Sequence, residues 1–439
     1  MSVRYDKLIP ALKALLPETR LNLLGRSVTF IRRLREITAS HFIWSVVMSR
    51  FGNGRPAFEQ ARHWYHRLTE TELWPRPFQM RFKSAAAVRM FEQAFEDAVK
   101  QWRVPALARH PLARHFPDVA VVDSTQVELT AELRPIFKGS YGHLSSLKVL
   151  LTISVFGLVP LCAAIVSGNR HDMLLFPPLE AFRPGTLMLF DKGFVAYSRL
   201  RAIREAGHHY LCPMRLNGNA LVVAAHRAPA YVKQILRRNP DGVWLRDILP
   251  TTKRIGKSWD LDVVVRPRNR RARASEVHAR LVIVPGPNNV QRPYLTDLDR
   301  PSWSPAALAE LYRLRWQVEL VFKELKQELN LESVPSNDRH AVQVLVWASL
   351  IALALSRTVS AWLCPRIELV GLGTRFRPAL TSRALRGAIR SLARALLAPP
   401  RLARLYLKDL ADDLLLAFRA RDSNRGDSFA RLEPLLRGP

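Results

Sequence analysis

The segment "FPDVAVVDSTQVEL", residues 116–129, marks the point at which the pattern of the sequence changes from helix to strand. Its valine-rich apolar run is typical of a buried strand. Residues 1–112 before it carry apolar side chains at spacings of three and four, which indicates amphipathic helices. A helical N-terminal region is therefore expected to precede a sheet-containing region.

More strands are predicted beyond this segment. Residues 147–167, "LKVLLTISVFGLVPLCAAIVS", predict two strands that turn at Gly157. Residues 186–194, "TLMLFDKGF", and 208–216, "HHYLCPMRL", predict two more, and the helical "YSRLRAIREAG" between them ends at Gly207. Because consecutive strands are followed by a strand–helix–strand crossover, the sequence predicts an α/β fold with a mixed sheet flanked by helices.

The sheet region is interrupted by a more polar stretch. Residues 216–293 contain "GVWLRDIL", "WDLDVVVRPR" and "ARLVIVP", which predict a β-rich insertion. "PYLTDL", residues 293–298, is a last short strand. Residues 304–331 predict one long helix that begins at the capping residue Ser304.

The chain is strongly basic. Its 67 Lys and Arg residues against 37 Asp and Glu give a formal net charge of +30 over 439 residues. Such an excess destabilises a compact fold through self-repulsion unless a polyanion is bound. Nucleic acid is therefore the first partner to consider, and a membrane surface the second.

Neither a disulfide scaffold nor a membrane span is expected. Cys162, Cys212 and Cys364 are far apart and form no CxxC pair, which argues against a structural zinc site and fits a reducing cytosol. The most apolar run, residues 344–355, is too short to cross ~30 Å of hydrocarbon. It predicts a buried core helix.

Three carboxylates are candidates for chemistry. Asp123 ends "DVAVVD" and Asp191 ends "LMLFD", and functional residues of open α/β sheets gather at the carboxyl ends of strands. Aspartates at such places also serve as turn or helix-capping residues. Glu319 lies at the edge of the apolar stripe of the long helix, where its basic neighbours could equally form ordinary i,i+4 pairs.

If the fold brings these carboxylates together, they repel one another unless a cation compensates them. Oxygen ligands without usable cysteine or histidine favour Mg²⁺ or Mn²⁺. Two such ions ~3.5–4 Å apart are typical of phosphoryl transfer, and the basic remainder of the chain would hold a phosphodiester substrate.

The spacing Tyr312-x2-Arg315-x3-Glu319-x6-Lys326 resembles the Y-R-E-K signature of the insertion-sequence-4 family of DDE transposases. "VVDST" and "LFDKGF" resemble the two aspartate motifs of that family, and "GNRHD" the segment ahead of the second. "YLTDL" resembles the strand before the glutamate helix. The resemblance covers about residues 116–357.

The resemblance implies an RNase-H-like core in which Asp123, Asp191 and Glu319 are catalytic and bind two Mg²⁺ (or Mn²⁺) ions. It also implies that Tyr312, Arg315 and Lys326 contact DNA, and we expect the nearby Lys323 and Lys192 to do so as well. The arginine loop of the insertion is either a clamp on flanking DNA or a solvated charge run; it contains Arg268, Arg270 and Arg271.

On this interpretation, residues 1–112 bind DNA ends, 113–215 and 294–357 are two parts of the catalytic core, 216–293 are the insertion, and the helical residues 358–439 serve dimerisation. The expected activity is cleavage at the ends of an insertion sequence and joining of the 3′-hydroxyls to target DNA. The expected partners are double-stranded DNA and a second copy in the synaptic complex, in a prokaryotic cytoplasm at the nucleoid.

Two other functions stay open. A non-catalytic DNA-binding protein derived from a transposase should have lost an acidic ligand, and all three acids are present here. An RNase-H-like nuclease or resolvase would need the same metals but would not join strands. A carboxylate-pair glycosidase leaves the charge of +30 unexplained.

Overall fold

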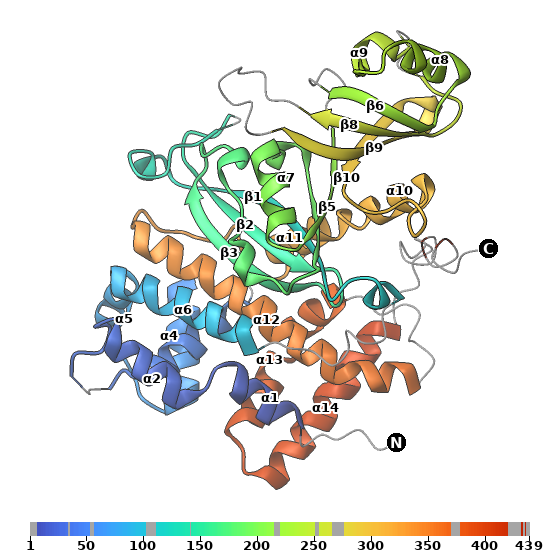
Figure 1. Cartoon of the computed structure of the whole chain (residues 1–439). Coiled ribbons are helices and arrows are strands. Elements are labelled where there is room, and N and C mark those ends of the chain that lie inside the picture. Colours follow the sequence, from blue (N-terminus) through green and yellow to red (C-terminus); the bar gives the residue numbers. More distant parts are fainter. Residues whose placement is uncertain are drawn as a thin grey trace.

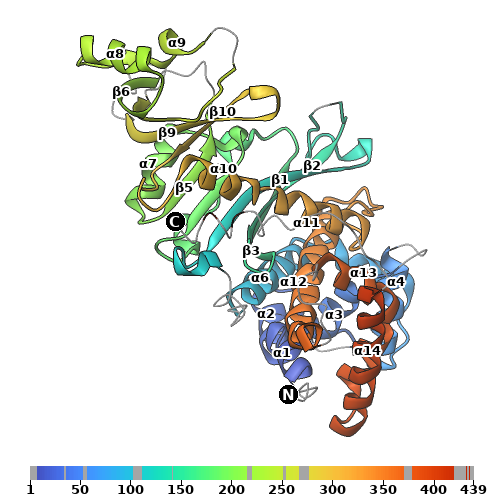
Figure 2. The same cartoon turned by 90° about the vertical axis from the view of Figure 1, so that its right-hand side faces the viewer.

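The computed structural model describes residues 7–33, 36–52, 57–101, 111–140, 142–214, 220–250, 254–265, 276–369, 378–419, 432 and 435. A sheet lies above helices that come from both ends of the chain (Figure 1). Seen from the side, the sheet extends from this helical part at one end to the strands of the insertion at the other (Figure 2).

The strands are β1 (Val119–Glu128), β2 (Ser146–Ser154), β3 (Val159–Ser167), β4 (Leu187–Phe190), β5 (His209–Pro213), β6 (Ala220–Arg227), β7 (Val243–Trp244), β8 (Trp259–Val265), β9 (Val277–Pro285) and β10 (Gln291–Thr296). In the described part of the chain they form one ten-stranded sheet in the order β3-β2-β1-β4-β5-β10-β9-β8-β6-β7.

The first five strands form the core of this sheet. β1 pairs antiparallel with β2 and parallel with β4, and β5 continues parallel to β4. β3 closes the edge antiparallel to β2, through a turn that holds Gly157 at φ 132°, where a side chain would be strained. These pairings confirm the predicted mixed sheet and its RNase-H-like core.

The insertion extends the core sheet rather than forming a separate one. β10 pairs antiparallel with β5, and β9, β8 and β6 follow outward. Two short helices, α8 (Ala230–Arg238) and α9 (Leu245–Ile248), accompany these strands. The prediction of a strand over "GVWLRDIL" was wrong beyond Trp244, because Leu245 and Ile248, three residues apart, are both buried by a helical turn. Arg268, Arg270 and Arg271 lie outside the described residues.

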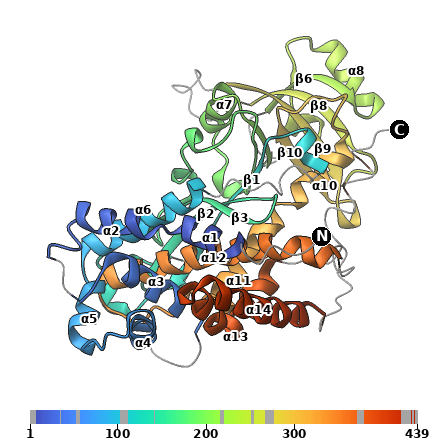
Figure 3. The ribbon, with the colours of Figure 1, turned by 90° about the horizontal axis from the view of Figure 1, so that it is seen from below.

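Helices of the two chain ends pack together below the sheet. They are α1 (Leu8–Leu15), α2 (Glu18–Ser27), α3 (Ala39–Ser49), α4 (Ala57–Thr69), α5 (Pro75–Phe82), α6 (Ala85–Gln101), α12 (Arg339–Leu369), α13 (Pro378–Leu397) and α14 (Pro400–Arg419). From below, α12 lies between the N-terminal helices and the α13–α14 pair (Figure 3).

Helix α12 contains the apolar run predicted as a core helix. Residues 339–363 are long and apolar enough to cross a membrane, but 94% of the most apolar window is buried inside the protein. Its neighbours include α1, α3, α6, α13 and β3. The burial confirms the prediction.

Two helices replace the predicted single helix over residues 304–331. α10 (Pro305–Arg313) begins after Ser304, whose hydroxyl accepts a hydrogen bond from the backbone N–H of Ala307 as predicted. α11 (Trp316–Gln327) follows after a break at Leu314–Arg315. There the backbone N–H groups of Arg315 and Val318 donate hydrogen bonds to the carbonyls three residues earlier, Tyr312 and Arg315, which is the pattern of a 3₁₀ turn.

Candidate active site

The two aspartates lie side by side on neighbouring parallel strands. Val122 of β1 is paired with Phe190 of β4, and this pairing ends at the next residues, Asp123 and Asp191. Parallel neighbours lie ~4.8 Å apart, so the fold places the two aspartates next to each other. The prediction that Asp123 ends its strand was wrong, because β1 continues to Glu128 by pairing with β2 alone.

The alternation along β1 directs Asp123 toward α11. Val121 packs in the core that contains α11 and α12, whereas Val122 packs on the opposite face with α7 (Tyr197–Glu205). Because side chains of a strand alternate between faces, Asp123 shares the face of Val121, and Ser124 shares the face of Val122.

Arg315 joins two of the three acids. Its Nη1 donates to Asp123 Oδ2 at 3.0 Å, and its Nη2 donates to Glu319 Oε1 at 2.6 Å. Arg315 lies at the break between α10 and α11, and Glu319 lies one turn into α11. The guanidinium of Arg315 therefore joins strand β1 to helix α11, through Asp123 and Glu319, which are 196 positions apart in the sequence.

The site is electrostatically crowded. The pKa of Asp123 is raised to about 6, chiefly by burial and also by the charges of Asp191 and Glu319, while the Ser124 N–H and Arg315 oppose the rise. Burial acts to lower the pKa of Arg315, but its acidic partners outweigh burial, so that pKa is raised. A positive charge at this point is favoured by its surroundings.

The donor set suits a hard divalent cation, because carboxylate oxygens are the ligands that Mg²⁺ and Mn²⁺ prefer. Within the described residues, no group of three or more His, Cys, Asp or Glu side chains is arranged to hold a metal ion as it stands. The guanidinium of Arg315 lies between Asp123 and Glu319 instead. Metal binding by all three acids would require Arg315 to move away.

The other predicted DNA-contacting residues lie on α10, on α11 and in the turn that follows Asp191. The Tyr312 hydroxyl donates to the Phe190 carbonyl at 3.5 Å, so the tyrosine lies beside the strand end that precedes Asp191. Lys326 pairs with Glu332 at 2.7 Å, and Lys323 and Lys192 are exposed.

Helix α11 is fixed from its buried side by an ion pair. Glu324 accepts two hydrogen bonds from Arg357 of α12, at 2.8 and 2.6 Å, and both side chains are essentially inaccessible to solvent. Ser382 of α13 donates to the same carboxylate. The helix that carries Glu319 is thereby tied to two C-terminal helices.

Sequence reasoning missed a polar cluster behind Asp123. Ser124 Oγ donates to Asp172 Oδ1 at 2.9 Å, and Lys148 Nζ donates to the same oxygen at 2.7 Å. One signal could have revealed it: Lys148 interrupts an apolar run in β2, every residue of which is buried. A buried ammonium group requires a partner.

The geometry defines an RNase-H-like sheet with one acidic residue within β1, one directly after β4 and one on helix α11. The family described as "Transposase DDE domain" matches residues 114–355. The chain belongs to this family, which confirms the prediction of an insertion-sequence DDE transposase.

Three relatives are insertion-sequence or putative transposases. The putative transposase y4zB of Sinorhizobium fredii is 27% identical over 50% of this chain and 54% of its own length. The transposases of IS231F from Bacillus thuringiensis and IS1151 from Clostridium perfringens are 23% and 21% identical, over 76% and 82% of this chain and 75% and 81% of their own lengths. The chain thus spans about half of the first relative and three quarters or more of the others. The piggyBac transposase synaptic complex with hairpin DNA is similar with a TM-score of 0.45 and 11% identity, over 98% of this chain and 88% of that one.

Proposed function

We propose that this protein cleaves the ends of an insertion sequence and joins the resulting 3′-hydroxyls to target DNA, with Asp123, Asp191 and Glu319 holding two Mg²⁺ (or Mn²⁺) ions. The observation that carries the proposal is the convergence of the three acids: Arg315 joins Asp123 to Glu319, and the pairing of β1 with β4 places Asp191 beside Asp123. When bound, the divalent ions would supply an activated water and stabilise the leaving oxygen of the phosphodiester.

The residues around the acids hold the DNA backbone. Arg315, Lys323, Lys326 and Lys192 offer positive charge to phosphates. Tyr312 contacts DNA as a hydrogen-bonding group and not as a covalent nucleophile, since it lies three residues before Arg315, next to the helix that carries the proposed metal ligand Glu319. No covalent protein–DNA intermediate is required.

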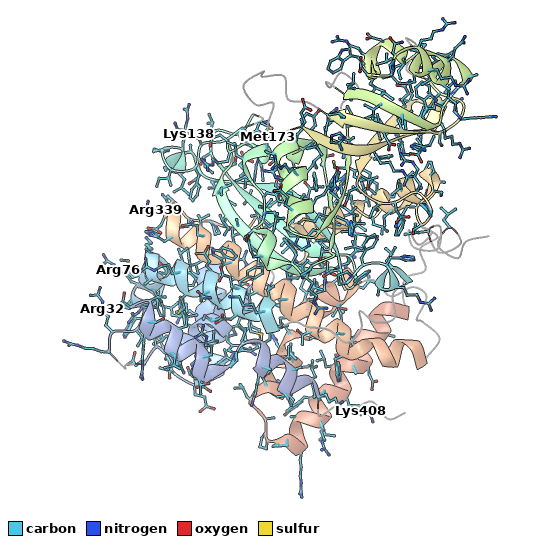
Figure 4. The ribbon with its side chains drawn as sticks, in the orientation of Figure 1. Arg32, Arg76, Lys138, Met173, Arg339 and Lys408 are labelled. Atoms are coloured by element: carbon cyan, nitrogen blue, oxygen red, sulfur yellow. The ribbon has the colours of Figure 1, made fainter. Side chains whose placement is uncertain are left out.

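DNA binding follows from membership of the family, and the charge of +30 supports it. Exposed Lys138, Arg339, Arg76 and Arg32 project from one side of the molecule, across the core and the N-terminal helices (Figure 4). This side is a surface along which DNA could run to the active site. The N-terminal helices would bind the element end, and residues 358–439 would serve a dimer that joins two ends at the prokaryotic nucleoid.

The test is cleavage of DNA that carries the inverted repeats beside the gene, with Mg²⁺ present. Asp191→Asn and Glu319→Gln should abolish cleavage and leave DNA binding intact. Asp118→Asn is the matched control, since Asp118 is a largely buried aspartate at the other end of β1 and should not matter for cleavage. Mg²⁺-dependent cleavage by either active-site variant would contradict the assignment.

Strand joining separates the proposal from its alternatives. A nuclease or resolvase with the same three acids would cut the substrate but leave the 3′-hydroxyls unjoined, and a non-catalytic DNA-binding protein would do neither. A supercoiled target plasmid added to the cleavage reaction distinguishes these outcomes.

A further inference from the structure

Two short turns lie on the α7 face of the sheet, beside the two aspartates. The first, Asp172–Leu174, belongs to the "GNRHD" segment and its continuation, and the second, Lys192–Phe194, directly follows Asp191. The two turns contact each other. Met173 of the first turn projects at the same upper edge of the core as Lys138 (Figure 4).

The first turn is tied to β1 through Asp172. Its Oδ1 accepts hydrogen bonds from the Ser124 hydroxyl, at 2.9 Å, and from Lys148 Nζ, at 2.7 Å. Lys148 also donates to the Arg170 carbonyl at 2.8 Å, and its side chain is only 6% exposed. Since Ser124 follows Asp123, and its N–H donates to Asp123 Oδ1 at 2.8 Å, Asp172 fixes the residue that orients the first aspartate.

The same turn is tied to the segment after Asp191. A methyl group placed on Gly193 would lie 3.4 Å from Asp172 Oδ2, so the two turns pack closely. Arg199 of α7 donates to the Met173 carbonyl at 2.7 Å and also to the Phe194 carbonyl. The turn at 172–174 therefore contacts both chain segments that carry an aspartate, from the face opposite Arg315.

We propose that Asp172, held by Lys148, is a positioning residue that sets the separation of Asp123 and Asp191 and thereby the affinity of the site for divalent cations. The inference rests on the proposed function, because it takes the two aspartates as metal ligands. Residues that orient metal ligands typically contribute 10–100-fold to metal affinity. Lys148 supplies the buried positive charge that holds the Asp172 carboxylate in place.

The experiment measures binding of Mn²⁺ to the full-length protein without DNA, by the loss of the electron paramagnetic resonance signal of free Mn²⁺. Ser124→Ala removes one hydrogen bond to Asp172 and leaves the Lys148–Asp172 pair intact, so it should fold. Its matched control is Ser154→Ala, which removes the hydrogen bond of 2.6 Å between Ser154 and Asp118 at the opposite end of the same two strands.

We expect Ser124→Ala to weaken Mn²⁺ binding about tenfold and Asp172→Asn at least as much, whereas Ser154→Ala stays within about twofold of wild type. Asp191→Asn should lose binding at the site. If Asp191→Asn loses Mn²⁺ while Ser124→Ala and Asp172→Asn bind as wild type, the positioning role is wrong and the proposed function stands. Equal weakening by Ser154→Ala also overturns it. If Asp191→Asn binds Mn²⁺ like wild type, the metal assignment itself fails.

Discussion

Replacing Asp123 by asparagine should stabilise the metal-free protein near neutral pH, although it removes a proposed metal ligand. Burial raises the pKa of the Asp123 carboxyl to about 6, with Asp191 and Glu319 contributing, from an ordinary value of 3.8. The folded protein therefore favours the protonated carboxyl, and holding it ionised costs free energy.

The sign and size follow from proton linkage. Because the folded-state pKa is the higher one, the folded protein binds more protons between the two values, and stability falls as the pH rises. The contribution is fully present below about pH 3.8 and is lost as the pH passes about 6. The gap corresponds to roughly 3 kcal/mol at neutral pH. Asparagine also weakens the hydrogen bond from Arg315, so we expect a net gain of about 1–3 kcal/mol.

The assay is guanidinium unfolding in EDTA, followed by tryptophan fluorescence. Asp123→Asn should be more stable than wild type near neutral pH, and the difference should shrink toward about pH 4. Added Mg²⁺ should stabilise wild type and Asp118→Asn but not Asp123→Asn, since only the last loses a proposed ligand. A less stable Asp123→Asn at neutral pH in EDTA, or a difference that does not change with pH, would refute the reasoning.

Three further substitutions test the surroundings of the site. Glu324→Gln leaves the charge of Arg357 buried without a counter-charge and should lower the free energy of unfolding by about 3–5 kcal/mol. The control is Glu205→Gln, which breaks an exposed i,i+4 pair with Arg201 and should change the free energy of unfolding by less than about 0.5 kcal/mol. Similar losses of unfolding free energy for Glu324→Gln and Glu205→Gln, measured by guanidinium unfolding, would contradict this expectation. Lys326→Ala should weaken binding to the element end and reduce the salt dependence of log K by about one unit, and an unchanged slope in a binding titration would remove it from the phosphate contacts.

Sequence patterns placed most of the sheet because the core strands differ sharply from their surroundings. The first four residues of valine-rich β1 and all four residues of the short apolar β4 are buried within the sheet, and an acidic residue directly follows each of these runs. The strand over residues 116–129 was predicted, but the placement of Asp123 at a strand end was wrong. The residues after Asp123 stay in β1 by pairing with β2, a long-range contact that local pattern does not encode.

The break between α10 and α11 could not be read from periodicity. Leu311, Leu314 and Val318 are all fully buried, and their spacing of three and four is the same in a straight helix and in one with a tight turn. At the break, the guanidinium of Arg315 donates hydrogen bonds to both Asp123 and Glu319. The contact with Asp123 on β1 is a tertiary contact, so local sequence periodicity does not reveal it.

If the proposed function holds, the place of Arg315 links metal binding to DNA binding. In the metal-free protein its guanidinium is held by Asp123 and Glu319, so it is not available to a phosphate. Cations that bind these carboxylates would release Arg315, and a phosphate that attracts Arg315 would in turn free the carboxylates. By thermodynamic reciprocity each ligand then raises the affinity for the other by the same factor. Under the proposed function, such a site would bind its metal ions most tightly when DNA is present, which would restrict cleavage chemistry to the bound complex.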